Sequence, residues 1–338
     1  MRKLNIFVAL FVVAGLAWGA YWWAGASALE RGLAAWLEAR RAEGWVASAE
    51  RLEVHGFPNR FDTTFSGLSL ADPHTRVAWT APDFRLFALS YRPNRLIALW
   101  PGPQTFATPD GTFELQGEPF RASFALGADR RLTLGPVTFE LGAARILSDK
   151  GQETRLDWGQ FSMRPKPISD NPKLYDVYLD VTGLTPDPSL RAALPGGDRL
   201  PEQIAHLRLS GSAEFDRPWD RRAIEERRPQ PRRLVIDELS AEWGGLLLQA
   251  RGTLDIGPGG LPEGELQATA RNWREILRLA EASGALDADR ARTLHRALGV
   301  VAALSGDPDT LDFPIRFSGG LASIGPVPIG PAPRLDLP

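Results

Sequence analysis

The chain has 338 residues, a formal net charge of −2 at pH 7 and no cysteine. This length, with 43% apolar residues, suits one large or two modest globular domains with a packed core and excludes a disordered chain. The near-neutral charge argues against nucleic-acid binding, which requires a strongly basic surface. The absence of cysteine excludes thiol catalysis, thiolate metal sites and a lipoprotein anchor, and it fits an oxidising compartment.

The first segment, residues 4–23, contains no charged residue. Roughly 20 apolar residues in a helix cross a hydrocarbon core about 30 Å thick. Basic residues precede the segment, and aromatic residues, which favour the membrane interface, close it. We predict a single-pass anchor at 1–26 in the inner (cytoplasmic) membrane, with the bulk of the chain in the periplasm. The anchor residues are Arg2, Lys3, Trp18, Tyr21, Trp22 and Trp23.

A cleaved signal peptide is the alternative, because Ala24, Ala26 and Ala28 offer small-residue cleavage sites. The uncharged run is longer than a usual signal h-region of about 7 to 15 residues, and it ends in bulky aromatic side chains. These features favour retention. Both alternatives export the chain.

The next segment, 27–44, has apolar residues at helical spacing, and Gly44 stands at the expected C-cap. It predicts a juxtamembrane helix that continues the membrane helix. Apolar and polar residues then alternate over stretches such as 177–182 and 246–256, which predicts strands with one apolar and one solvated face. Turn sequences at 109–111, 149–151 and 257–260 separate such strands.

A helical period returns at 272–305 and predicts a helix hairpin, with Asn272 as N-cap and Glu275 completing a capping box. The predicted fold class is therefore mainly β (α+β): long antiparallel β-meander sheets, an N-terminal transmembrane helix, and a C-terminal helix hairpin packed on a sheet. The predicted domains are the anchor 1–26, the juxtamembrane helix 27–44, a first β-rich portion 45–215, a charged linker 216–233, and a second β-rich portion 234–338.

The linker 216–233 carries seven arginines among acidic residues and three prolines. One interpretation is a contact with anionic lipid headgroups or an acidic partner. The residues of this possible anionic contact are Arg221, Arg222, Arg227 and Arg228. The other interpretation, which we favour, is a solvated linker whose interleaved charges pair locally.

Catalytic and phosphate-binding motifs are absent from the sequence. The histidines, His55, His74, His206 and His295, lie far apart along the chain, and the glycine run 257–264 lies between two strands rather than before a helix. The D-x-D pairs at 287–289 and 307–309 lack the other ligands of a calcium loop. We predict a protein that is not an enzyme and has neither metal nor cofactor.

The densest motif lies within 52–61 and comprises His55, Gly56, Phe57, Pro58, Arg60 and Phe61. We interpret it as structural: Gly56 permits a bulge or a positive φ, Pro58 interrupts strand pairing, and both phenylalanines are buried. The alternative makes His55 and Arg60 ligand contacts.

This motif, placed after a membrane segment and a short helix, resembles an uncharacterised bacterial envelope family, domain of unknown function 2125. The C-terminal patterns at 242–246, 252–254, 313–320 and 325–333 resemble the same family and, more loosely, AsmA-like modules. The family resemblance implies a membrane-anchored periplasmic protein without an assigned activity. The AsmA-like resemblance implies long curved sheets with an apolar inner face, associated with phospholipid movement or outer-membrane homeostasis; fold alone does not establish function.

Three functions remain open. The first is a tethered carrier that binds or moves phospholipid or another hydrophobic ligand in a groove of one-sided strands. The second is a non-catalytic scaffold or accessory subunit that binds another envelope protein through sheet edges or the 272–305 helices. The third is a hydrolase with an unrecognised site built from His55, His206 or nearby carboxylates. Alternation alone does not separate an open groove from a closed core.

Overall fold

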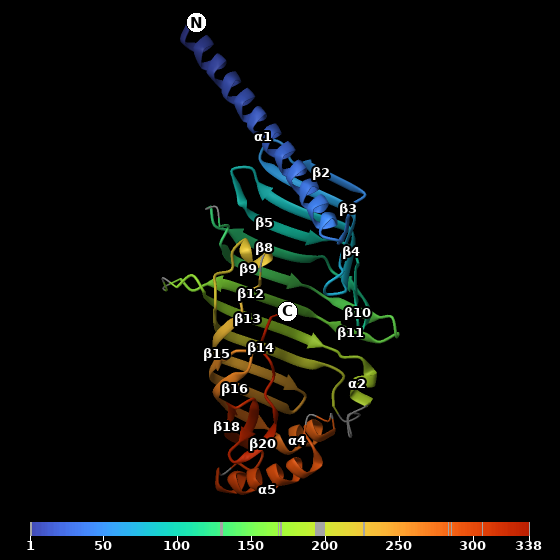
Figure 1. Ribbon diagram of the computed structural model, residues 1–338, viewed down its shortest axis with the longest axis vertical. Coiled ribbons are helices and arrows are strands. Elements are labelled where there is room, and N and C mark those ends of the chain that lie inside the picture. The colour runs from blue at the N-terminus through green and yellow to red at the C-terminus, as the bar shows by residue number, and fades with distance from the viewer. Residues whose placement is uncertain are drawn as a thin grey trace. The chain divides into compact units, whose positions relative to one another are not determined.

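The computed structural model describes residues 2–128, 131–167, 169, 171–192, 200–225, 227–282, 284, 286–305 and 307–337. The fold is mainly β with antiparallel strand pairs, which confirms the predicted fold class (Figure 1). The chain forms two compact units. Unit 1 comprises Met1–Leu126 and Ile146–Gly151, and unit 2 comprises Gly127–Arg145 and Gln152–Pro338.

The division between the units differs from the predicted linker at 216–233. The residues before Pro231 connect β14 (Ile204–Phe215) to β15 (Pro231–Trp243), and these two strands pair along most of their length. Because they share a hydrogen-bonded ladder, both sides of the charged segment belong to unit 2. Its prolines and charges mark a long connection within one sheet rather than a domain boundary.

Unit 1 begins with one uninterrupted helix, α1 (Arg2–Ala42), which extends beyond the strands of its unit (Figure 1). The first half exposes its apolar side chains, and the helix is long and apolar enough to cross a membrane. The second half packs on the sheet, with Leu33 and Leu37 against Phe65 and Leu68. Gly44 follows the helix end and has φ +89°, a conformation that glycine adopts without strain. The helix after residue 27 is thus a continuation of the apolar helix, as predicted, and α1 ends at Ala42.

The strands of unit 1 form an antiparallel meander in which β3, β4 and β5 are successive neighbours and β5 also pairs with β8. Its strands carry a chain of contacting aromatic rings, Trp79, Phe84, Trp100 and Phe120, with neighbouring centroids 4.7–5.8 Å apart. The strands are β1 (Val46–Ser48), β2 (Arg51–His55), β3 (Arg60–Asp72), β4 (Val77–Leu89), β5 (Arg92–Trp100), β6 (Gln104–Thr108), β7 (Gly111–Gly117) and β8 (Phe120–Leu126), and β10 (Ala144–Ser148) includes residues of both units.

Unit 2 is a longer meander in which β9, β12, β13, β14, β15, β16, β17, β18, β19 and β20 follow one another across the sheet. Its further strands are β9 (Leu134–Leu141), β11 (Glu153–Leu156), β12 (Trp158–Pro165), β13 (Leu174–Leu184), β16 (Leu246–Ile256), β17 (Pro262–Arg271), β18 (Thr310–Ser318), β19 (Leu321–Ile324) and β20 (Val327–Pro331). The helices are α2 (Pro188–Ala192), α3 (Arg222–Glu225), α4 (Trp273–Ala282) and α5 (Ala288–Ser305). The last two are the predicted helix hairpin.

Asn272 precedes α4 but does not form the predicted capping box. Its backbone has φ +56°, and its side-chain amide donates a hydrogen bond of 2.7 Å to the carbonyl of Gly245. The amide N–H of Glu275 bonds instead to the backbone carbonyl of Asn272. Asn272 therefore fastens the start of α4 to the β15–β16 turn, a role that depends on a residue distant in sequence.

Candidate functional site

Apolar side chains form a continuous row across one face of the unit 2 sheet. The strand register places Phe139, Phe161, Leu179, Leu209 and Leu239 next to one another on β9, β12, β13, β14 and β15. Residues directly opposite in antiparallel strands project from the same face. We define the apolar face as this row together with the rows on either side of it, which contain Val137, Leu141, Met163, Val177, Val181, Leu207, Ile236 and Ala241.

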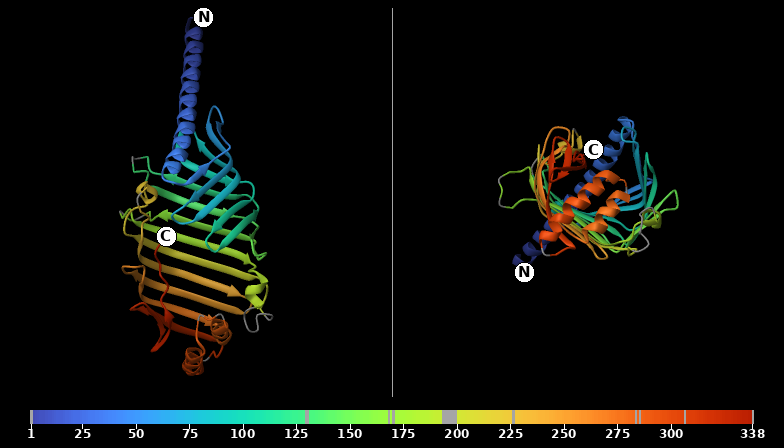
Figure 2. Two further views of the ribbon diagram at one scale, coloured as in Figure 1. Left: turned by 45° about the vertical axis from the view of Figure 1, so that its right-hand side comes forward. Right: turned by 90° about the horizontal axis from the view of Figure 1, so that it is seen from below.

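The row continues onto β16–β18, where its side chains are buried. There Ala268 and Phe313 are buried in a core that includes Trp273 of α4 and Leu294 of α5. The register joins this part to the apolar face, since Leu239 is opposite Ala250 and Ala250 is opposite Ala268. Figure 2 shows both helices at this end of the sheet.

The other end of the row is partly exposed. Phe139 and Leu239 are 37% and 38% exposed, and Phe161, Leu179 and Leu209 are half-buried. The sheet thus combines a closed core at β16–β18 with an accessible apolar surface on β9 and β12–β15. The sequence carries the signal for this surface, because Val137, Phe139 and Leu141 alternate with polar residues, but only the register shows that five strands contribute to it.

The opposite face of the same strands is polar and contains a buried carboxylate. Asp180 is 6% exposed and accepts hydrogen bonds from the Tyr178 hydroxyl at 2.6 Å, His206 Nε2 at 2.5 Å and Arg208 at 3.3 Å. Burial raises the pKa of Asp180, but these hydrogen bonds and the charges of His206 and Arg208 outweigh it and leave that pKa below its ordinary value. The sequence analysis did not identify this cluster, because its members come from two strands.

The Asp180 carboxylate accepts hydrogen bonds from both His206 and Tyr178. The hydrogen bond to Asp180 raises the pKa of the Tyr178 hydroxyl. The other histidines lie elsewhere: His55 contacts Glu53 at 3.4 Å, and His295 packs against Trp273. Among the described residues, no group of three or more His, Asp or Glu side chains is placed to hold a metal.

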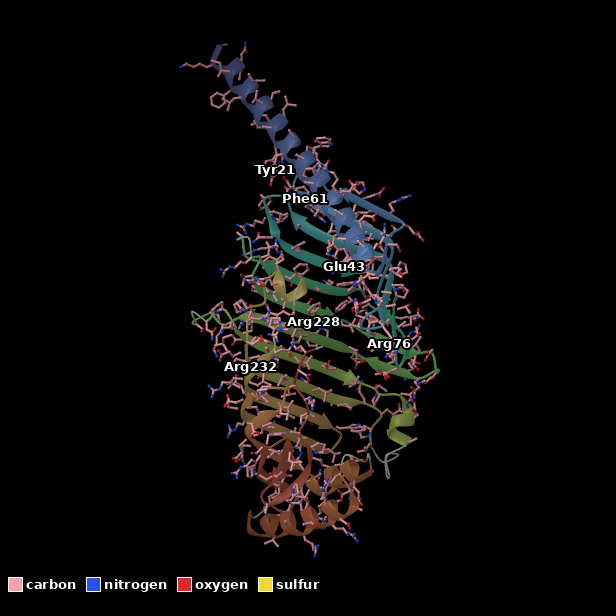
Figure 3. All side chains as sticks on the ribbon, viewed as in Figure 1. Tyr21, Glu43, Phe61, Arg76, Arg228 and Arg232 are labelled. Atoms are coloured by element: carbon pink, nitrogen blue, oxygen red, sulfur yellow. The ribbon has the colours of Figure 1, made fainter. Side chains whose placement is uncertain are left out.

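The predicted anchor residues contact the strands of unit 1 through three hydrogen bonds. Trp18 Nε1 donates to the Pro58 carbonyl at 3.0 Å, the Tyr21 hydroxyl to the Ser90 carbonyl at 2.7 Å, and Trp22 Nε1 to the Arg60 carbonyl at 2.7 Å. Figure 3 shows Tyr21 and Phe61 at this junction. Of the other predicted anchor residues, Trp23 is 69% exposed, and Lys3 is also exposed.

The 52–61 motif forms the strand side of this junction. Gly56 has φ +101°, and Phe61 is buried beneath α1, with its ring near Trp22 and Gly25. Phe57, which we expected to be buried, is instead 61% exposed, because it lies at the tip of the β2–β3 turn.

The two proposed ligand contacts in this motif have partners within the protein. His55 lies beside Glu53, and Arg60 bonds Asp62 at 2.8 Å while its guanidinium stacks over the Phe87 ring. These contacts are those of an exposed strand surface.

The arginine-rich segment pairs largely with its own acidic residues. Arg227 bonds Asp216 at 2.6 Å, and Arg222 lies 3.8 Å from Asp220. Arg221 and Arg228 are exposed on the same segment. Local pairing is the arrangement that the interleaved charges favour.

Comparison with known proteins places the chain in a family. No curated protein and no solved structure matches it. The sequence model of a bacterial family described as "Uncharacterized protein conserved in bacteria (DUF2125)" matches residues 22–333. The matched region runs from the last anchor residues through both units and includes the junction motif and the apolar face. The chain therefore belongs to this bacterial family.

Proposed function

We propose that the protein is a non-enzymatic, membrane-anchored component of the bacterial cell envelope that binds the acyl chains of a phospholipid, or a similar hydrophobic ligand, on the apolar face of unit 2. The observation that carries this proposal is the row from Phe139 to Leu239, which stays accessible although its continuation is buried under α4 and α5. The α1 helix would hold this surface in the periplasm, close to the membrane that supplies the ligand.

The chemistry of the apolar face fits an acyl chain. The row offers aromatic and branched aliphatic side chains from five successive strands and contains no charged residue. Each buried methylene contributes about 0.8 kcal/mol, so roughly ten methylenes contribute about 8 kcal/mol. Association and ordering oppose this with about 4 kcal/mol or more. A long contact across several strands is therefore needed for useful affinity.

Site-specific photocrosslinking in the native envelope tests the proposal. A benzophenone amino acid replaces either Phe139 or Glu140, which are consecutive, exposed residues on opposite faces of β9. After irradiation, adducts of the full-length protein are identified by mass spectrometry. We expect lipid adducts at Phe139 and none at Glu140.

The other outcomes are equally informative. Adducts with another envelope protein at Phe139, without lipid, would overturn the lipid proposal and favour the accessory-subunit function. Absence of any adduct at Phe139, or equal lipid labelling at both positions, would refute selective binding on the apolar face.

A further inference from the structure

Two turns at one end of unit 1 are fastened both to α1 and to each other. The β2–β3 turn, residues 56–59, accepts a hydrogen bond from Trp18, and the β4–β5 turn, residues 90–91, accepts one from Tyr21. The amide N–H of Ser90 also bonds to the carbonyl of Asn59 at 2.9 Å. We call these two segments the tip turns. Two hydrogen bonds therefore hold the tip turns to α1, and a third joins the turns to each other.

The tip turns expose large aromatic side chains. Phe57 is 61% and Tyr91 is 57% exposed, and the rings of Trp22 and Phe57 form a T-shaped pair with centroids 5.5 Å apart. Neighbouring exposed aromatic groups of this size mark an interaction surface more often than an isolated exposed residue does. Arg92 follows Tyr91 directly and is exposed as well, so a cation accompanies the aromatic surface.

The helix sets the depth of this surface. The apolar run ends at Trp23, and Trp18, Tyr21 and Trp22 lie in its last turns, where tryptophan and tyrosine settle at headgroup level. The hydrogen bonds place the tip turns beside these same residues. The aromatic side chains of the turns therefore reach the headgroup region whenever residues 4–23 span the bilayer.

We propose that the tip turns form a lipid-interface contact site, in which Phe57 and Tyr91 insert among the headgroups and outer acyl segments beside α1. Unit 1 would then meet the bilayer at three adjoining points, the helix and two turns, and not through a flexible tether. The site also gives residues 18–22 a structural role. Cleavage after Ala24, Ala26 or Ala28 would remove Trp18 and Tyr21, which donate to the tip turns, and Trp22, which donates to Arg60 beside them. This inference rests on anchoring by α1 and is independent of the ligand proposed for unit 2.

Spin labels measure the depth of the turns directly, because the chain has no cysteine of its own. The full-length protein carries a single nitroxide at Phe57→Cys, Tyr91→Cys or the control His74→Cys. His74 lies in the β3–β4 turn, at the far end of β3, whose 13 residues at about 3.3 Å each separate it from the tip turns by roughly 40 Å. Each protein is reconstituted into vesicles of phosphatidylcholine and phosphatidylglycerol, so that no other protein is present.

We expect the labels at 57 and 91 to collide more with oxygen, which partitions into lipid, than with a water-soluble nickel chelate. The label at 74 is expected to show the reverse. Two independent labelled positions guard against a local folding defect in either one. Equal access of the nickel chelate to all three labels would overturn the proposal. A mature chain from native membranes that lacks residues 18–22, measured by intact mass, would overturn it as well.

Discussion

The contact between Gly25 of α1 and the ring of Phe61 predicts an unusual cost for a glycine-to-alanine change in a helix. A Cβ at Gly25 would lie 2.8 Å from Phe61 Cζ, whereas at Gly32 it would meet nothing within 4 Å. Alanine is favoured over glycine in a helix by about 1 kcal/mol. Overpacking of a filled contact typically costs about 1 to 3 kcal/mol. Gly32→Ala should therefore stabilise the protein, and Gly25→Ala should not.

We expect the two variants to differ by about 1 to 3 kcal/mol in the free energy of unfolding of unit 1. Both variants gain the same helix propensity, but only Gly25→Ala also incurs the overpacking cost. Guanidinium denaturation of the full-length protein in detergent micelles, followed by near-UV circular dichroism, measures it. In a Phe61→Ala background the clash is absent, so Gly25→Ala should become stabilising by about 1 kcal/mol. Equal stabilisation by both glycine variants in the natural background would refute the packing of Phe61 against α1.

Three further predictions concern unit 2. The lowered pKa of Asp180 means that its stabilising contribution is present above pH 3.8, the unperturbed value, and is lost as the pH falls through its folded-state pKa. Asp180→Asn should therefore flatten the pH dependence of thermal unfolding in this acidic window. Phe139→Glu should abolish co-purifying lipid, and its stability should change by less than about 1 kcal/mol, as at other exposed positions. The control Glu140→Ala should retain the lipid. Unchanged lipid content in Phe139→Glu would contradict the proposed binding surface. Leu294→Ala, at a position that is 1% exposed, should destabilise the helix-covered core by about 2 to 5 kcal/mol in chemical denaturation, and a cost below about 1 kcal/mol would mean that α5 does not pack there.

Several features of the fold could be predicted because they depend on local periodicity. The uncharged run before Trp23, the period-two alternation of residues 246–256 and the helical spacing after Asn272 each specify an element from neighbouring residues alone. Gly44 likewise marked the end of α1, since a positive φ is a local requirement.

The sequence was less informative about features that depend on partners distant along the chain. Phe57 resembles a core residue by type, yet its place at a turn tip exposes it, and the Asn272 side chain bonds Gly245 instead of its own helix. The charged segment 216–233 has the composition of a linker, but strand pairing on both sides places it inside one unit. Contacts with distant residues decided the outcomes for Asn272 and for the charged segment, whereas the β2–β3 turn decided that of Phe57.

The sequence by itself determined that the protein has an apolar helix of membrane-spanning length followed by one-sided strands, because length, charge and period are properties of contiguous residues. The tertiary structure alone decided which part of the apolar surface is closed and which stays accessible. That outcome depends on the register that aligns Phe139 with Phe161 and on the strands over which α4 and α5 pack. Burial arises from contacts between segments far apart in the chain, and a local pattern specifies the apolar face but not what covers it.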